Sequence, residues 1–157
     1  GRPYLYEIRQ CIDNDGAAII LLDETESIVV AQRGLPGRTE KIVELTRNPP
    51  PSMRAVLETG DPRIINDTHA SDEWTVVAGY EYIRAWLGVP LLVKGDIIGI
   101  LSVDRDTADA FTAQDLDLAV TFANQAAIAI DNVRLFTRLQ EYAGHLEAHV
   151  SERTREL

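Results

Sequence analysis

Residues 84–103, RAWLGVPLLVKGDIIGILSV, contain two apolar runs on either side of a short polar turn. The runs, residues 85–93 and 97–103, are rich in β-branched and large aliphatic side chains, and the turn contains Gly95. This combination is typical of a β-hairpin. The pattern predicts two antiparallel strands near the centre of one sheet.

After Phe111 the apolar spacing changes from two to about three and a half residues, the spacing of a helix. No Gly or Pro occurs from Thr112 to Ala143. We expect Thr112 to cap this helix, with Asp115 as the acidic residue three positions later. A helix that continued to Leu157 would be about 70 Å long, whereas the radius of gyration of a domain this size is about 15 Å. Its last turns are therefore expected to project and to need a partner.

The rest of the chain shows shorter signals. In chain order we expect a helix over residues 3–12 beside the long helix, strands over 17–22 and 27–32, helices over 39–46 and 52–59, a strand over 63–66, a loop over 67–81, and a strand over 82–93. Ser52 is expected to cap its helix and Gly60 to end it, and one helical turn is expected near Trp74. Sequential hairpins without a βαβ repeat predict an α+β fold. Its central antiparallel sheet of five to six strands would carry the terminal helices on one face and the loop-borne elements on the other.

Composition limits the classes of function. A length of 157 residues suits one domain, and 45% hydrophobic with 25% charged residues is ordinary for a globular protein. The formal net charge of −10 argues against nucleic acid as a partner. No apolar run is long enough to cross a bilayer. With one cysteine, Cys11, we expect a cytoplasmic setting, and the ends of the sequence suggest a fragment of a longer protein.

The chain resembles the GAF domain family in a series of short motifs. These are Trp86-Leu87-Gly88-Val89-Pro90-Leu91, Gly99-Ile100-Leu101, Ala110-Phe111-Thr112 with Asp115-Leu116, and residues 125–132 followed by Leu135-Phe136. The resemblance implies a GAF/PAS-like domain over residues 1–136. Residues 137–157 resemble the coiled-coil linker helix that joins such a domain to an output module, such as a histidine kinase, which this sequence does not contain.

The resemblance also implies a place for a small ligand, on the sheet face covered by residues 66–82. The candidate binding residues are Asp67, His69, Trp74, Tyr80, Tyr82, Arg84 and Trp86. Aromatic walls with a few polar groups are what a small-molecule pocket needs. The alternative is that the rings fill this space themselves. His69 could also ligate a haem iron, although a lone histidine on a polar loop is more often structural.

Two family chemistries depend on cysteine. Members that carry a covalent bilin, and members that reduce free methionine sulfoxide, use cysteines around the pocket, and that segment contains none here. We therefore expect neither activity, and we expect Cys11 to act as a small packing residue. His145 and His149 have a metal-compatible spacing but no third ligand nearby, so we expect no metal site.

Cyclic-nucleotide-binding members carry an Asn-Lys pair, a Phe and an Asp-Glu pair. The matching positions here are Asp104-Arg105, Phe111 and Asp115-Leu116, so three of the five residues differ. Cyclic nucleotides and haem remain candidate ligands. The structural alternative is that Arg105 and Asp115 form an ion pair, with Phe111 as an apolar plug beside it.

The end of the long helix carries a coiled-coil seam. The seam residues are Leu135, Leu139, Tyr142, Leu146 and Val150. Their steps of four, three and four, followed by another four, follow a heptad with one local shift. We expect a parallel homodimer, the alternative being one amphipathic helix that lies on its own domain. Together with this helix, the resemblance to GAF domains implies a non-enzymatic sensory domain that relays a stimulus through the helix, or alternatively a ligand-free dimerisation module.

Overall fold

The computed structural model describes residues 8–22, 27–35 and 39–156. Five strands form one antiparallel sheet in the order β2-β1-β5-β4-β3. They are β1 (Gly16–Leu22), β2 (Ser27–Arg33), β3 (Arg63–Ile65), β4 (Ala85–Val93) and β5 (Asp96–Arg105). The helices are α2 (Thr39–Arg47), α3 (Pro51–Thr59) and α4 (Ala113–Glu156), and residues 8–11 are also helical. The predicted α+β fold is confirmed.

The predicted hairpin forms the middle of the sheet. Lys94 and Gly95 both have positive φ, 51° and 85°, as a two-residue hairpin turn requires. β5 pairs with β4 on one side and β1 on the other. The expected start of β4 at residue 82 is wrong, because residues 82–84 belong to the preceding loop.

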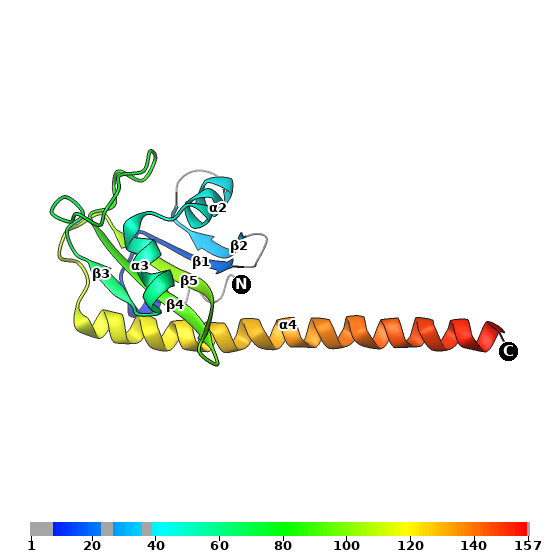
Figure 1. Ribbon diagram of the computed structural model, residues 1–157. Helices are drawn as coiled ribbons and strands as arrows, with labels where there is room; N and C mark the ends of the chain where they lie inside the picture. The colour runs from blue at the N-terminus through cyan, green and yellow to red at the C-terminus, as the bar shows by residue number, and fades with distance from the viewer. Residues whose placement is uncertain (1–7, 23–26, 36–38, 157) are drawn as a thin grey trace.

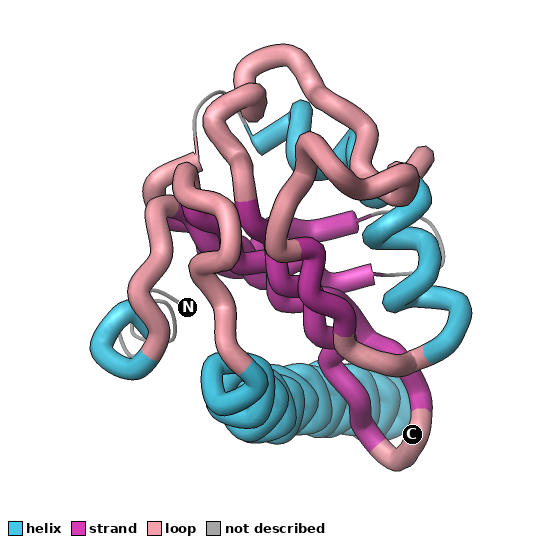
Figure 2. Tube along the Cα trace, turned by 90° about the vertical axis from the view of Figure 1, so that its left-hand side faces the viewer, coloured by secondary structure: helices cyan, strands magenta, loops and turns pink. Residues whose placement is uncertain are grey.

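The sheet lies between α4 on one face and α2 and α3 on the other (Figure 2). It separates two apolar clusters, one on each face. Successive side chains of a strand point to opposite faces, so Leu101 and Val103 of β5 pack towards α4, whereas Ile100 packs towards α2 and α3. Ile8 and Ile12 join the α4 layer, which confirms that the described part of the first helix packs beside the long one. Residues 3–7 of that prediction lie outside the described residues.

Two local predictions are wrong. α3 begins at Pro51 with Pro50 as its N-cap, and Ser52 is buried in the first turn instead of capping it. Proline is favoured at this first position because its missing N–H has no helical partner to lose. Gly60 does end α3, with φ 73° and its N–H donating to the Val56 carbonyl. The expected helical turn at Trp74 is absent, since described residues 67–84 contain only turns and bends.

α4 runs along the sheet and then leaves it (Figure 1). It begins with the predicted capping box, in which the Asp115 N–H donates to Thr112 Oγ1 at 3.1 Å and the Thr112 N–H donates to Asp115 Oδ2 at 2.9 Å. Its inward face is buried as far as Ile130. At 1.5 Å per residue, its 44 residues span about 66 Å. No described helix is long and apolar enough to cross a membrane.

Candidate functional site

The face of the sheet opposite α4 forms the floor of a pocket. Strand alternation places Ala18 and Ile20 of β1, Ser102 and Asp104 of β5, and Trp86 of β4 on this face. Trp86 and Asp104 are direct partners across the β4–β5 ladder. Their Cβ atoms are therefore neighbours, about 5 Å apart in such a pair.

Two helices and a loop form the roof. α2 contributes Ile42 and Leu45, and α3 contributes Ser52 and Met53. The loop between β3 and β4 adds Trp74, Thr75, Val77, Tyr80 and Ile83. The cavity measures about 70 Å³, whereas pockets for drug-sized ligands measure roughly 300–1,000 Å³. In this conformation the pocket therefore admits only a molecule of a few heavy atoms.

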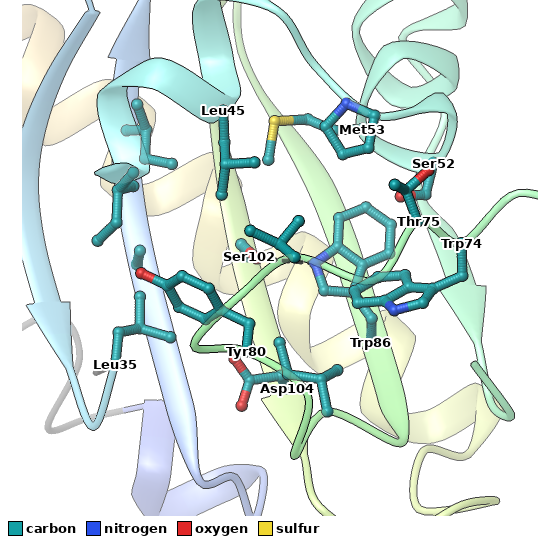
Figure 3. Close-up of a pocket in the computed structure, with 16 residues that line it drawn as sticks. Leu35, Leu45, Ser52, Met53, Trp74, Thr75, Tyr80, Trp86, Ser102 and Asp104 are labelled. Carbon is teal, nitrogen blue, oxygen red and sulfur yellow. Dashed lines mark hydrogen bonds between the residues drawn. The ribbon is translucent and has the colours of Figure 1, made fainter. Parts of the chain in front are cut away.

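Trp86 is held in one orientation. Its indole Nε1–H donates to Ser102 Oγ at 2.8 Å. Gly88 makes room for the ring, because a Cβ there would lie only 2.2 Å from Trp86 Cη2. The Trp74 ring lies beside it with centroids 6.0 Å apart and planes tilted by 52° (Figure 3). This is a favourable separation for an aromatic pair.

Asp104 is the one charged residue among the described side chains that line the pocket. It is only 2% exposed. Burial raises its pKa to about 6, and the nearby Asp15 carboxylate adds to this, while the Tyr82 hydroxyl and Arg33 oppose it. Within the described ranges, neither Asp104 Oδ1 nor the Tyr82 hydroxyl has a partner in hydrogen-bond geometry. Burial likewise raises the pKa of Tyr82.

Hydrogen bonds and ion pairs hold the loop between β3 and β4 over the pocket. Arg84 Nη2 donates to Asp67 Oδ1 at 3.2 Å, and the Thr68 hydroxyl donates to the Ile83 carbonyl at 2.8 Å. The bond from Arg84 lowers the pKa of Asp67. Further along the loop, Arg63 Nη1 of β3 donates to Glu73 at 3.0 and 3.1 Å. The first two contacts hold the two ends of the loop together, and the third ties its middle to β3.

The predicted binding residues therefore divide into groups. Trp74, Tyr80 and Trp86 line the pocket. Asp67 and Arg84 pair with each other outside it, and Tyr82 lies next to Asp104. His69 is exposed, and its backbone N–H donates to Asp67 Oδ1. Ligand binding by any of the seven stays a prediction.

The predicted binding residues do not include Ser102 or Asp104, although Asp104 is matched to the first position of the cyclic-nucleotide motif. The signal was present in the strand over residues 96–105, where positions 100, 102 and 104 alternate onto one face. A Ser and an Asp among aliphatic residues on that face indicate a polar spot on a buried surface. Without the fold, however, nothing in the pattern shows which face carries the pocket.

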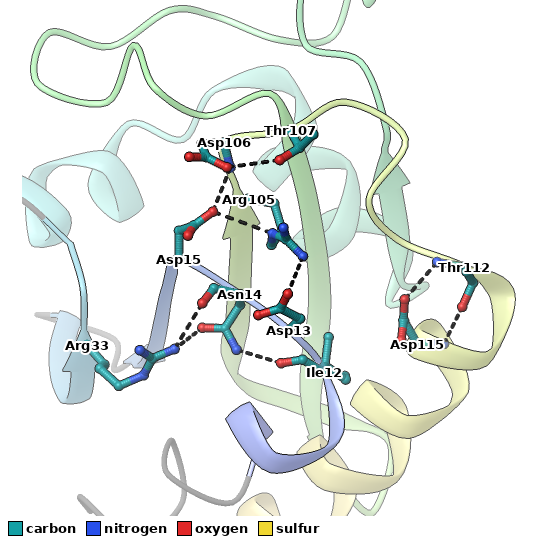
Figure 4. Close-up of polar contacts among 10 residues, drawn as sticks. All are labelled: Ile12, Asp13, Asn14, Asp15, Arg33, Arg105, Asp106, Thr107, Thr112 and Asp115. Carbon is teal, nitrogen blue, oxygen red and sulfur yellow. Dashed lines mark hydrogen bonds and ion pairs between the residues drawn. The ribbon is translucent and has the colours of Figure 1, made fainter.

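The expected ion pair between Arg105 and Asp115 is wrong. Arg105 Nη1 pairs instead with Asp13 at 2.7 Å, and its Nε lies 3.5 Å from Asp15 (Figure 4). The side chain leaves β5 on the face opposite Asp104, where the segment before β1 supplies the two carboxylates. Asp115 serves the helix cap, and Phe111 is buried as expected.

The expectation that Cys11 is a packing residue is also wrong. Ile8 and Ile12 turn inward from this helical segment, and Cys11 is exposed at its edge, beside Leu118 and Phe122 of α4. It thus lies on the side of the sheet away from the pocket. Among the described residues no cluster of three His, Cys, Asp or Glu side chains could hold a metal ion, and His145 and His149 are exposed on α4.

The projecting part of α4 carries an exposed apolar stripe. The predicted seam residues have these exposed fractions: Leu135 46%, Leu139 66%, Tyr142 63%, Leu146 43% and Val150 61%. Ile128 and Val133 extend the exposed apolar surface towards the domain. The seam residues are thus not covered by the described part of their own chain.

Comparison with known proteins gives the family. The family model for the GAF domain matches residues 5–131. The chain belongs to the GAF domain family. GAF domains are sensory and regulatory domains typical of signalling proteins, usually without catalytic activity, although some are enzymes.

This GAF domain is similar to one curated protein and to two solved structures described here. A curated relative, the circadian input-output histidine kinase CikA of Thermosynechococcus vestitus, is 30% identical over 81 residues, 51% of this chain and 11% of that protein. The match thus spans about a tenth of the kinase. The domain of a putative two-component sensor histidine kinase from Sinorhizobium meliloti has a TM-score of 0.68 at 23% identity and covers 88% of this chain and 93% of its own. The type II free methionine-R-sulfoxide reductase of Thermoplasma acidophilum has a TM-score of 0.67 at 16% identity. The match covers 80% of this chain and 86% of the reductase chain.

Proposed function

We propose that this GAF domain is the sensory part of a signalling protein, and that it relays the binding of a small ligand through a parallel dimer of α4 helices to an output module such as a histidine kinase. The observation that carries the proposal is the exposed apolar stripe on α4, which continues for several turns past the last residue buried against the sheet. An apolar heptad stripe exposed to water is stabilised by a matching helix. A second copy of the same chain supplies one in register.

Hydrogen bonds connect the pocket loop with the start of α4. The pocket loop begins directly after Asn66, and the Asn66 side chain bonds to the backbone of Phe111, just before α4. A ligand that shifts the loop would therefore act on the start of the helix. It changes the output only if it binds one helix packing better than the other.

Sedimentation equilibrium at tens of micromolar tests the dimer. The double variant Leu139→Lys with Leu146→Lys should be a monomer, because it places charge in the seam. The matched control, Thr137→Lys with Ala148→Lys, adds the same charge on the opposite face of α4 and should remain a dimer. Monomers in the unaltered chain, or equal dimerisation of both variants, would contradict the relay.

The second candidate is a ligand-free dimerisation module, which the small volume of the pocket favours. A thermal-shift screen with cyclic nucleotides, haem, bilins and small metabolites separates the two. A dimer that none of these compounds stabilises would favour the second candidate. We do not propose sulfoxide reduction, because Cys11, the one cysteine of the chain, lies away from the pocket.

A further inference from the structure

The charge that lines the pocket is negative. Asp104 is the single charged group among the described lining residues. Arg63, Arg84 and Arg105 are engaged elsewhere, with Glu73, Asp67 and Asp13 respectively. Arg33 is close enough to Asp104 to oppose the rise in its pKa, but its guanidinium donates to Asn14 Oδ1 and does not line the pocket. Among the described side chains that line the pocket, a phosphate or carboxylate ligand would therefore meet a buried acidic group and no arginine or lysine.

The charge of the Asp104 carboxylate is only partly compensated. The residue is 2% exposed, its Oδ1 has no hydrogen-bond partner, and within the described residues it forms no ion pair. Arg33 and Tyr82 favour its charged form, but burial outweighs them and raises its pKa. A buried charge that is only partly compensated is costly. The cost falls when a molecule in the pocket brings a positive charge that also donates a hydrogen bond.

The surroundings of Asp104 suit the rest of such a molecule. Trp86 is its cross-strand partner, and Trp74 and Tyr80 complete an aromatic wall. Figure 3 shows the carboxylate close to the Tyr80 ring and the two indoles side by side. Aromatic faces attract alkylammonium groups through cation–π interactions, and this attraction is stronger when water is excluded.

We propose that the pocket binds a small organic cation, with its ammonium group against Asp104 and its alkyl groups against Trp74, Trp86 and Tyr80. This rests on the proposed ligand-sensing function and gives the chemical class of its ligand. The cavity of about 70 Å³ fits a methylammonium-sized head group. A larger cation enters when Trp74, which sits half-buried on the loop, and the flexible Met53 shift outward.

Tryptophan fluorescence reads this site alone, because the chain has two tryptophans and both line the pocket. The probes are methylammonium, tetramethylammonium and choline, with 3,3-dimethylbutan-1-ol as the uncharged analogue of choline, all at constant ionic strength. We expect saturable changes with at least one cation. The alcohol should bind more weakly by about 10-fold or more, as loss of a charge-assisted contact implies.

Asp104→Asn tests the carboxylate with little change of shape, and it should weaken binding of the cation by about 10- to 100-fold. Asp96→Asn is the matched control, since Asp96 is an exposed aspartate at the other end of β5. It should bind like the unaltered chain. Circular dichroism would verify that both variants are folded.

Four results would overturn the inference, and the first three separate it from the sensing function. Equal binding of choline and the alcohol, or unchanged binding in Asp104→Asn, means that the pocket does not select cations, while ligand sensing stands. Binding of an anionic or neutral metabolite but of none of the cations has the same meaning. A pocket that responds to no compound in either screen overturns both, and the dimer measured by sedimentation then supports the ligand-free module.

Discussion

Asn66 and Phe111, 45 positions apart, are joined by two hydrogen bonds. Asn66 Nδ2 donates to the Phe111 carbonyl at 2.8 Å, and the Phe111 N–H donates to Asn66 Oδ1 at 3.0 Å. The Asn66 carbonyl also accepts the Asp109 N–H at 2.6 Å. One amide side chain thus connects the end of β3, where the pocket loop starts, with the segment that enters α4.

Asn66→Asp should destabilise the domain. The carboxylate keeps the acceptor for the Phe111 N–H but replaces the donor with an oxygen that faces a carbonyl. We expect a loss of about 1–3 kcal/mol in the free energy of unfolding, measured by urea denaturation. Gln114→Glu makes the same amide-to-carboxylate change at an exposed position in the first turn of α4, and it should cost nothing. Equal stability of the two variants would show that the Asn66 bonds contribute little.

Gly88→Ala should disturb the pocket. The added methyl group would meet the Trp86 ring at 2.2 Å, so the indole must move and its bond to Ser102 weakens. Overpacking of this kind costs about 1–3 kcal/mol, and the tryptophan emission should shift with it. Gly144→Ala is the contrasting variant, because Gly144 has open space around it within α4. There alanine should raise helicity, measured by circular dichroism. Unchanged emission in Gly88→Ala would refute the tight fit of the ring.

Asp104→Asn should change how stability depends on pH. Because burial raises the pKa of Asp104 to about 6 from 3.8, the folded state holds the proton more tightly than the unfolded chain. Ionisation therefore destabilises the fold as pH rises from about 4 to 6, and the full penalty, on the order of 3 kcal/mol, persists above that range. Tyr82, Asp15 and Arg33 face the carboxylate and help to set this window.

Relative to the unaltered chain, Asp104→Asn should thus gain stability between pH 4 and 6 and keep a constant advantage above pH 7. Urea denaturation of both proteins across pH 4–8 measures the difference. If the free energies of unfolding of the two proteins changed with pH in the same way, Asp104 would have an ordinary pKa and would not be desolvated in solution.

Thr112→Ala should weaken the start of α4. Loss of an N-cap hydroxyl costs about 0.5–2 kcal/mol, here through the bond from the Asp115 N–H. Thr121→Ala is the control within the same helix, since Thr121 is exposed and its hydroxyl donates only to the Asp117 carbonyl one turn earlier. Thermal denaturation should show a lower midpoint for Thr112→Ala alone. A similar drop in both variants would point to general helix propensity instead of the cap.

The predictions that succeeded used information contained in short windows of sequence. The hairpin around Gly95, the capping box at Thr112 and the glycine end of α3 each depend on residues within four positions of one another. The failures came where a local rule had a competitor. Ser52 is a good cap residue, but the prolines before it start the helix one position earlier.

The partners of long-range polar groups could not be predicted in this way. Arg105 had carboxylates at several positions in the sequence that it could have paired with, and only the pairing of β1 with β5 brings Asp13 and Asp15 to it. The bonds of Asn66 to Phe111 have no signal in either segment alone. The burial of Asp104, with one carboxylate oxygen left without a hydrogen bond, likewise appears only in the folded chain.

The sequence by itself determined the elements, the α+β class and the helix that outruns its domain, because period, capping and turn chemistry act between neighbours along the chain. Only the tertiary structure decided which strand face the pocket occupies, how small the cavity is and which charges are left without partners. Those properties depend on distances between residues far apart in the sequence, and strand order and packing set these distances.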